Sequence, residues 1–143
     1  MTKGEIALAN FQTGLNCAQS VVLAFKDELG LDEKTLKKLA IGYGGGVGRQ
    51  REVCGAVLGM TMVLSYLLSD GQDKLAIYSI IQSACNEFKE QVGSIVCKDL
   101  LDGEILKDKS AKPEARTPEY YKKRPCGELC SIAAEITQKY ISK

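Results

Sequence analysis

Residues 42–68 have the sequence GYGGGVGRQREVCGAVLGMTMVLSYLL and join a glycine-rich segment to the most apolar stretch of the chain. Five of the seven residues at 42–48 are glycine, and each glycine inside a helix costs about 0.5–1 kcal/mol relative to alanine. We therefore expect a loop at 42–48. The apolar run from Val53 to Leu68 predicts a buried central helix, which Ser69-Asp70-Gly71 ends.

The segments around this stretch have helical periodicity, and none has the alternation of a strand. The expected helices are Lys3–Phe11 before Gly14, Cys17–Leu29 between Asn16 and Gly30, a helix after Asp32 with Leu36, Leu39 and Ala40 inward, Gln72–Val92 with Leu75, Tyr78, Ile81, Cys85 and Phe88 on one stripe, a short helix from Ser94 to Leu101, and Pro125–Ile141. The charged residues 104–124 contain Pro113 and Pro118, which predicts a long surface loop or cover with one helical turn. We predict an all-α fold, a single compact bundle of six to seven helices.

The length and charge of the chain narrow the class of protein. Its 143 residues suit one domain, residues 1–143. The 19 Lys and Arg residues nearly balance the 18 Asp and Glu residues, so no electrostatic field favours nucleic acid. No apolar run approaches the roughly 20 residues that span a bilayer, and the N-terminus lacks the regions of a secretory signal. We expect a cytoplasmic protein that binds neither nucleic acid nor membranes.

Six cysteines and no histidine restrict the available chemistry to sulfur, carboxylates and basic groups. In a reducing compartment such cysteines are metal ligands or redox thiols more often than disulfides. Four of them, Cys17, Cys54, Cys97 and Cys126, fall at expected helix starts, where unpaired N–H groups and the helix dipole favour the thiolate. If these helix starts converge, the four sulfurs could hold a metal centre or exchange disulfides. Cys85 is expected in the core, and Cys130 is open between packing and function.

The glycine segment before Cys54 is a second candidate feature. It matches neither the G-x-x-x-x-G-K-[ST] phosphate loop nor a strand-led G-x-G-x-x-G, so nucleotide binding is disfavoured. We expect Gly45 and Gly46 to bring amides, and Arg49 with Arg51 to bring positive charge, toward the group that Cys54 holds. The alternative is that both arginines are solvated. In the helix that follows, Gly55 and Gly59 are expected to permit close helix packing.

The hexapeptide Cys54-Gly55-Ala56-Val57-Leu58-Gly59 resembles the signature C-G-A-x-x-G of the C_GCAxxG_C_C family, small redox-active proteins named for their cysteines. The resemblance covers almost the whole chain. Its other elements are NCAQS at 16–20, GGGVG at 44–48, GSIVC at 93–97 with Leu100 and Leu101, and Cys126 followed by AAEI at 133–136. It implies that the family's four cysteines correspond to Cys17, Cys54, Cys97 and Cys126. It also implies redox chemistry, because related domains are joined to cytochromes with an iron–sulfur centre.

These observations leave several functions open, of which a packing scaffold with incidental cysteines is the least favoured. The four cysteines either ligate an iron–sulfur cluster, with [2Fe–2S] favoured, or cycle between thiol and disulfide, with Cys54 as attacking nucleophile and Cys17 as a second catalytic residue. Gly45, Gly46 and Arg49 are the cofactor-binding candidates. Both versions imply a redox protein partner, and homodimer formation stays open. The alternative is a non-redox interaction protein with a structural zinc ion on four thiolates, although paired C-x₂₋₄-C spacing is nearly absent.

Overall fold

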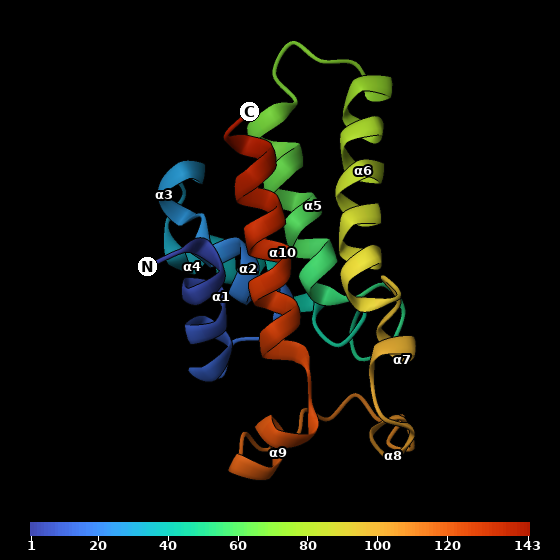
Figure 1. Cartoon of the computed structure of the whole chain (residues 1–143). Helices are drawn as coiled ribbons and strands as arrows, with labels where there is room; N and C mark the ends of the chain where they lie inside the picture. Colours follow the sequence, from blue (N-terminus) through green and yellow to red (C-terminus); the bar gives the residue numbers. More distant parts are fainter.

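The computed structural model describes all 143 residues as helices and connecting loops, without a strand (Figure 1). The α-helices are α1 Lys3–Gln12, α2 Cys17–Ala24, α3 Lys26–Leu29, α4 Glu33–Ala40, α5 Gly55–Leu68, α6 Lys74–Val92, α7 Cys97–Leu100, α8 Gly103–Leu106, α9 Pro118–Lys123 and α10 Cys126–Ile141, with a 3-10 turn at Ile41–Tyr43. The all-α prediction is confirmed. The number of helices exceeds the expected six to seven because the helix expected at 17–29 is divided into α2 and α3, and because residues 103–123 form two short helices, α8 and α9, where one helical turn was expected.

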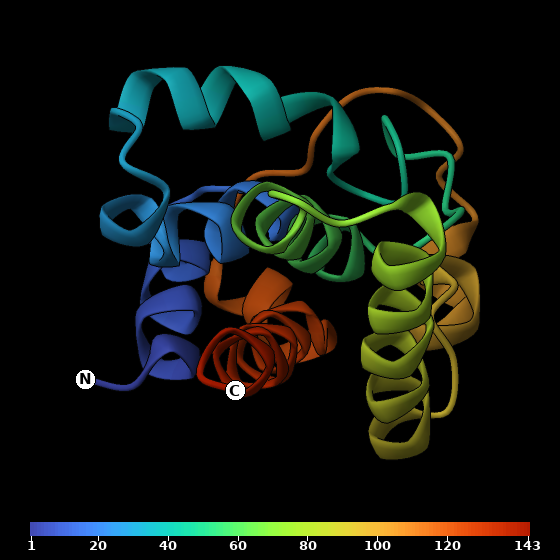
Figure 2. The same ribbon diagram turned by 90° about the horizontal axis from the view of Figure 1, so that it is seen from above.

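Helices α5 and α10 lie side by side at the centre of the molecule (Figures 1 and 2). Helices α1 and α2 pack against them on one side, α6 packs on the other, and α4 covers α2. All eight residues of α2 are buried, so this helix is the innermost element. The glycine loop, α7, α8 and α9 lie together at the end where α5 and α10 begin (Figure 1). No helix of the protein is long and apolar enough to cross a membrane.

Several details of the expected helices are wrong, among them the position of Leu39, which was expected inward but is 54% exposed. The expected helix 17–29 is interrupted at Phe25, whose backbone leaves helical geometry while its ring is fully buried. The carbonyl of Ala24, which the interruption frees, accepts a hydrogen bond of 3.0 Å from Lys3 Nζ. Leu75 and Tyr78 were expected on the buried stripe of α6 but are 75% and 59% exposed, because this helix is buried only further along, at Ala84 and Phe88.

Helices α2 and α5 approach each other closely at two glycines of α5. A Cβ on Gly59 would lie 2.9 Å from the carbonyl oxygen of Ala18, and one on Gly55 would lie 3.1 Å from the Cβ of Cys17. Both distances are shorter than ordinary contacts between a Cβ and its neighbours, so only glycine fits without a shift of the backbone. The close packing predicted for Gly55 and Gly59 is therefore confirmed, and it brings the N-terminus of α5 against that of α2.

We predict that Gly59→Val lowers the free energy of unfolding by about 1–3 kcal/mol, because the new side chain overpacks the contact with α2. Urea unfolding monitored by circular dichroism measures the change. Gly103→Ala is the matched control, since a Cβ there meets nothing within 4 Å and the backbone is not left-handed. Equal stabilities of the two variants would show that the α2–α5 contact is not constrained by Gly59.

Candidate functional site: a four-cysteine cavity

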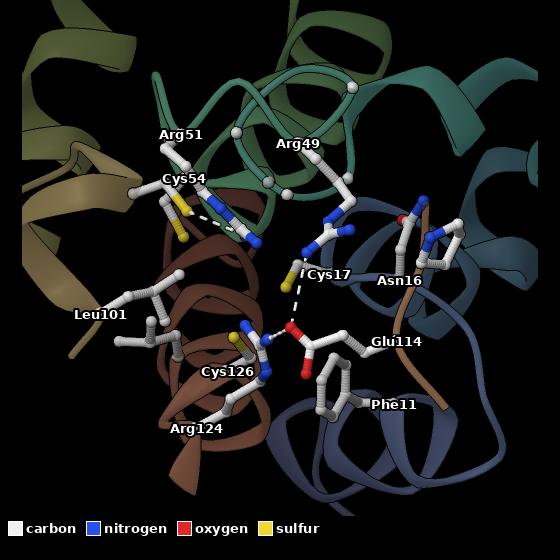
Figure 3. Close-up of a pocket in the computed structure, with 18 of the residues that line it drawn as sticks. Phe11, Asn16, Cys17, Arg49, Arg51, Cys54, Leu101, Glu114, Arg124 and Cys126 are labelled. Atoms are coloured by element: carbon white, nitrogen blue, oxygen red, sulfur yellow. Dashed lines mark hydrogen bonds and ion pairs between the residues drawn. The ribbon is translucent and has the colours of Figure 1, made fainter. Parts of the chain in front are cut away.

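A cavity of about 320 Å³ is lined by Cys17, Cys54, Cys97 and Cys126 (Figure 3). Cys17, Cys97 and Cys126 are the first residues of α2, α7 and α10, and Cys54 is the N-cap residue of α5. All four side chains are buried. The structure therefore places the four helix starts that the sequence singled out around one cavity.

Cys54 and Cys97 are held near each other by a short antiparallel backbone bridge. Val53 pairs with Val96, and the N–H of Cys54 donates to the carbonyl of Ile95 at 2.7 Å. This pairing corrects the expected start of the short helix, which begins at Cys97 and not after a Ser94 cap, because the backbone is extended through Val96. Tertiary pairing between segments about 40 residues apart thus decides where Cys97 lies.

Cys17 is positioned by a capping box and has Cys126 and Cys130 as neighbours. The Asn16 side chain accepts from the N–H of Gln19 at 2.9 Å, and the Gln19 side chain accepts from the N–H of Asn16 at 3.1 Å. Although the neighbouring thiol of Cys126 lowers it, the pKa of Cys17 is raised well above its usual value by the thiol of Cys130 and by burial. Cys130 itself is fully buried behind the cavity wall and donates from Sγ to the Cys17 carbonyl at 3.7 Å.

The last cysteine, Cys85, lies on α6 away from the cavity. It is half-buried and packs against the edge of the core, so the expected core position is only partly reached. Neither Cys85 nor Cys130 lines the four-cysteine cavity. Cys85 is therefore a suitable control position for experiments on the cavity cysteines.

The glycine loop has a left-handed backbone that extends beyond its glycines. Gly45, Gly46 and Gly48 have positive φ, and so do Val47, Arg49 and Arg51, with φ of 64–67°. Left-handed geometry costs roughly 1–2 kcal/mol for each residue with a side chain. Arg49 and Arg51 both line the cavity in this conformation. The loop thus stores strain beside the cysteines, and nothing in the sequence signalled positive φ at these three residues.

Most amides of the glycine loop are not available to a ligand. The N–H groups of residues 47–52 all donate to carbonyls of residues 42–47 within the loop itself. The N–H groups of Gly45 and Gly46 have no acceptor in the protein, and both residues line the cavity. Of the loop amides expected to face the group that Cys54 holds, only those of Gly45 and Gly46 are therefore free to donate to it.

Buried arginines dominate the charge of the cavity wall. Arg51 Nη1 lies 4.0 Å from the sulfur of Cys97, whereas Arg51 Nε and Nη2 are buried without any partner. Arg124, at 9% exposure, and Arg116 also line the cavity, and Glu114 is its single carboxylate. Arg116, Arg124 and Glu114 were not among the site residues predicted from the sequence. The position of Arg124 two residues before Cys126 was the one available signal.

The thiols are protonated at neutral pH in the metal-free cavity. Burial raises the pKa of Cys54 to about 12, although the N–H groups of Ala56 and Val57 oppose the shift. Burial also raises the pKa of Cys97, against the effect of the Arg51 guanidinium. The pKa of Cys126 is raised by its hydrogen bond with Cys17 and by burial. Desolvation thus outweighs the helix N-termini that were expected to favour thiolates.

The donor groups are not arranged for a single metal ion. No three Cys, Asp or Glu side chains surround a common point as ligands of one ion. Cys54 and Cys97 are joined by the backbone bridge, whereas Cys17 and Cys126 line the cavity from the starts of α2 and α10. This arrangement leaves the open volume of the cavity between four sulfurs.

Comparisons with known proteins agree with this pattern of cysteines. The family model described as "Putative redox-active protein (C_GCAxxG_C_C)" matches residues 15–140. An uncharacterised protein of Archaeoglobus fulgidus is 28% identical over 134 residues, covering 85% of this chain and 82% of the relative. No solved structure matches the chain. The family name writes G-C-A-x-x-G, whereas this chain has the cysteine first, at Cys54-Gly55.

We predict that Cys54 in the reduced, metal-free protein reacts with iodoacetamide at pH 8 far more slowly than in the unfolded chain, because a pKa near 12 leaves on the order of a thousandfold less thiolate. The rate in the folded protein should keep rising between about pH 9 and 11, where the unfolded chain levels off. Mass spectrometry of the Cys54 peptide measures both rates.

The raised pKa of Cys54 also makes the free energy of unfolding depend on pH. The folded state keeps the Cys54 proton to a higher pH than the unfolded chain, so the free energy of unfolding falls as the pH rises from about 9 toward 12. An alkylation rate that levels off near pH 9 in the folded protein would contradict the assignment. Residual unfolding is excluded by circular dichroism at each pH.

Proposed function

Because the chain belongs to the C_GCAxxG_C_C family, we propose that it is a redox protein whose cavity binds an iron–sulfur cluster through Cys17, Cys54, Cys97 and Cys126. The observation that carries the proposal is the buried guanidinium of Arg51, with two donors that have no acceptor, beside four thiols on one cavity. Buried donors without partners are rare in proteins and indicate a ligand.

The charge of the wall fits an anionic group. Four arginines line the cavity and only one carboxylate opposes them, while the thiols are neutral. Four thiolates around an iron–sulfur core are anionic as a whole, and their sulfur atoms accept hydrogen bonds. Arg51 would donate to them from Nε and Nη2. Because the thiols must lose their protons to bind iron, cluster assembly in this cavity is coupled to proton release.

The pairing of the cysteines favours a [2Fe–2S] cluster, in which each iron takes two protein ligands. Cys54 and Cys97 are held by one backbone bridge, and Cys17 and Cys126 begin α2 and α10, two helices that pack against each other. Each set would supply the ligands of one iron. A structural zinc ion, by contrast, requires four sulfurs at about 2.3 Å from one point. When bound, the cluster would supply one-electron transfer, which requires a redox protein as partner.

A second candidate function is thiol–disulfide exchange, favoured by the position of Cys17 and Cys126 on one cavity, where each thiol shifts the pKa of the other. Oxidation would form a sulfur–sulfur bond between them and pass two electrons and two protons to a disulfide of the partner, which becomes two thiols. The raised pKa of Cys54 makes this residue a poorer nucleophile than the sequence suggested.

The decisive experiment is anaerobic purification with analysis of iron, acid-labile sulfide and zinc, together with the visible absorption spectrum. We expect coloured protein with about two iron atoms and two sulfides per chain. Cys54→Ser should lose most of the iron, whereas Cys85→Ser, outside the cavity, should retain it. Zinc at one per chain would overturn both redox functions. Metal-free protein with a reversible Cys17–Cys126 disulfide would replace the cluster with the second candidate.

A further prediction concerns Arg51. In the cluster-loaded protein, Arg51→Gln should make the reduction potential more negative, because a buried positive charge that stabilises the reduced state is lost. Glutamine meets the same left-handed backbone requirement, so the strain at position 51 is matched. Lys98→Gln is the control, since it removes an exposed and screened charge next to Cys97. Equal reduction potentials of the two variants would show that Arg51 does not act on the cluster.

A further inference from the structure

Residues 107–117, here called the strap, cross the mouth of the four-cysteine cavity. Ala111, Pro113 and Glu114 of the strap line the cavity. One end of the strap is anchored by Arg116, which donates to the carbonyls of Phe11 and Leu15 at 2.8 and 2.9 Å. The guanidinium of Arg116 also stacks on the Phe11 ring, 4.3 Å from its centroid.

The middle of the strap is held by one carboxylate between two arginines (Figure 3). Glu114 Oε1 accepts from Arg49 Nη2 at 3.4 Å and also accepts from Arg124 Nη2. Arg49 belongs to the glycine loop, and Arg124 lies two residues before the start of α10. Glu114 therefore bridges two walls of the cavity. Arg49 also holds the strap through Asp108 and the carbonyl of Lys112.

The partners of this bridge differ in burial. The Arg124 side chain is 4% exposed, whereas that of Glu114 is 39% exposed. A buried cation without a counter-ion is strongly destabilised, so Arg124 requires an anion at this place. Glu114, on a surface segment, loses little when it returns to water. The cations are therefore fixed by the fold, and the carboxylate is the exchangeable member.

We propose that Arg49 and Arg124 form a binding site for the carboxylate of a small molecule, and that Glu114 occupies this site when the strap is closed. The position of Glu114 shows that the two guanidiniums accept a carboxylate oxygen between them. The cavity volume, about 320 Å³, admits a small carboxylic acid but no protein segment. Binding displaces Glu114 and releases the strap, which gives the ligand access to the cysteines. This inference holds for the metal-free protein and does not rest on the cluster.

The test is calorimetric titration of the reduced, metal-free protein with sodium acetate, with sodium chloride and sodium sulfate at equal ionic strength as reference ions. Glu114→Gln should bind acetate on the order of tenfold more tightly, because the internal competitor is lost. Adding Arg124→Gln to that variant should abolish binding. Glu104→Gln is the matched control, since this exposed carboxylate pairs only with Lys107. Circular dichroism checks that each variant is folded.

A second measurement uses the unmodified chain. Acetate should accelerate tryptic cleavage after Lys109 in the strap. Sodium chloride and sodium sulfate at equal ionic strength should accelerate this cleavage less. Equal acetate affinity in the original chain and in Glu114→Gln would overturn the proposal, as would acetate binding that survives the loss of Arg124. A stronger response to sulfate than to acetate would overturn the assignment to carboxylates. Failure of iron to bind would leave each of these outcomes unaffected.

Discussion

The close approach of α5 to α2 at Gly55 and Gly59 is the contact on which the site depends. Each glycine brings α5 against the backbone or Cβ atoms of α2, so the two helix starts meet with Cys17 and Cys54 on one cavity. Because α2 is buried along its whole length, its position is set by α1, α4, α5 and α10 together. A side chain at either glycine would separate the sulfurs as well as loosen the core. The same hexapeptide that carries the family signature thus carries the packing constraint.

The glycine loop and the strap complete the cavity from opposite sides. The loop stores strain in the left-handed residues Val47, Arg49 and Arg51, and its own hydrogen bonds hold that conformation. Arg49 pairs with Glu114, so an ion pair joins the glycine loop to the strap. A strained backbone conformation persists where several surrounding contacts hold it in place. Here the backbone bridge to Val96 supplies that support.

Electrostatics in the cavity follow from desolvation more than from the helix dipoles. The N-terminal positions of the four cysteines favour thiolates. Burial nevertheless raises the pKa values of Cys54, Cys97 and Cys126, and this effect is larger than the decrease expected from the helix N-termini. The result is a cavity with neutral thiols and cationic guanidiniums. Such a wall is complementary to anions, whether thiolates bound to iron or the carboxylate of a small ligand. The proposed cluster and the proposed carboxylate site therefore use the same excess of positive charge at different arginines.

The sequence by itself determined the helical class, most of the longer helices and the positions of four cysteines at helix starts, because caps, periodicity and glycine effects act within a few residues. The break at Phe25, the exposure of Leu75 and the presence of two short helices in residues 103–123 escaped it, since packing decides them. Only the tertiary structure decided that the cysteines meet, that Cys130 lies against Cys17, and that Arg51 and Arg124 are buried beside them. It also decided the protonation of the thiols. These properties depend on contacts between residues up to 113 positions apart and on the loss of water around them, which no local pattern encodes.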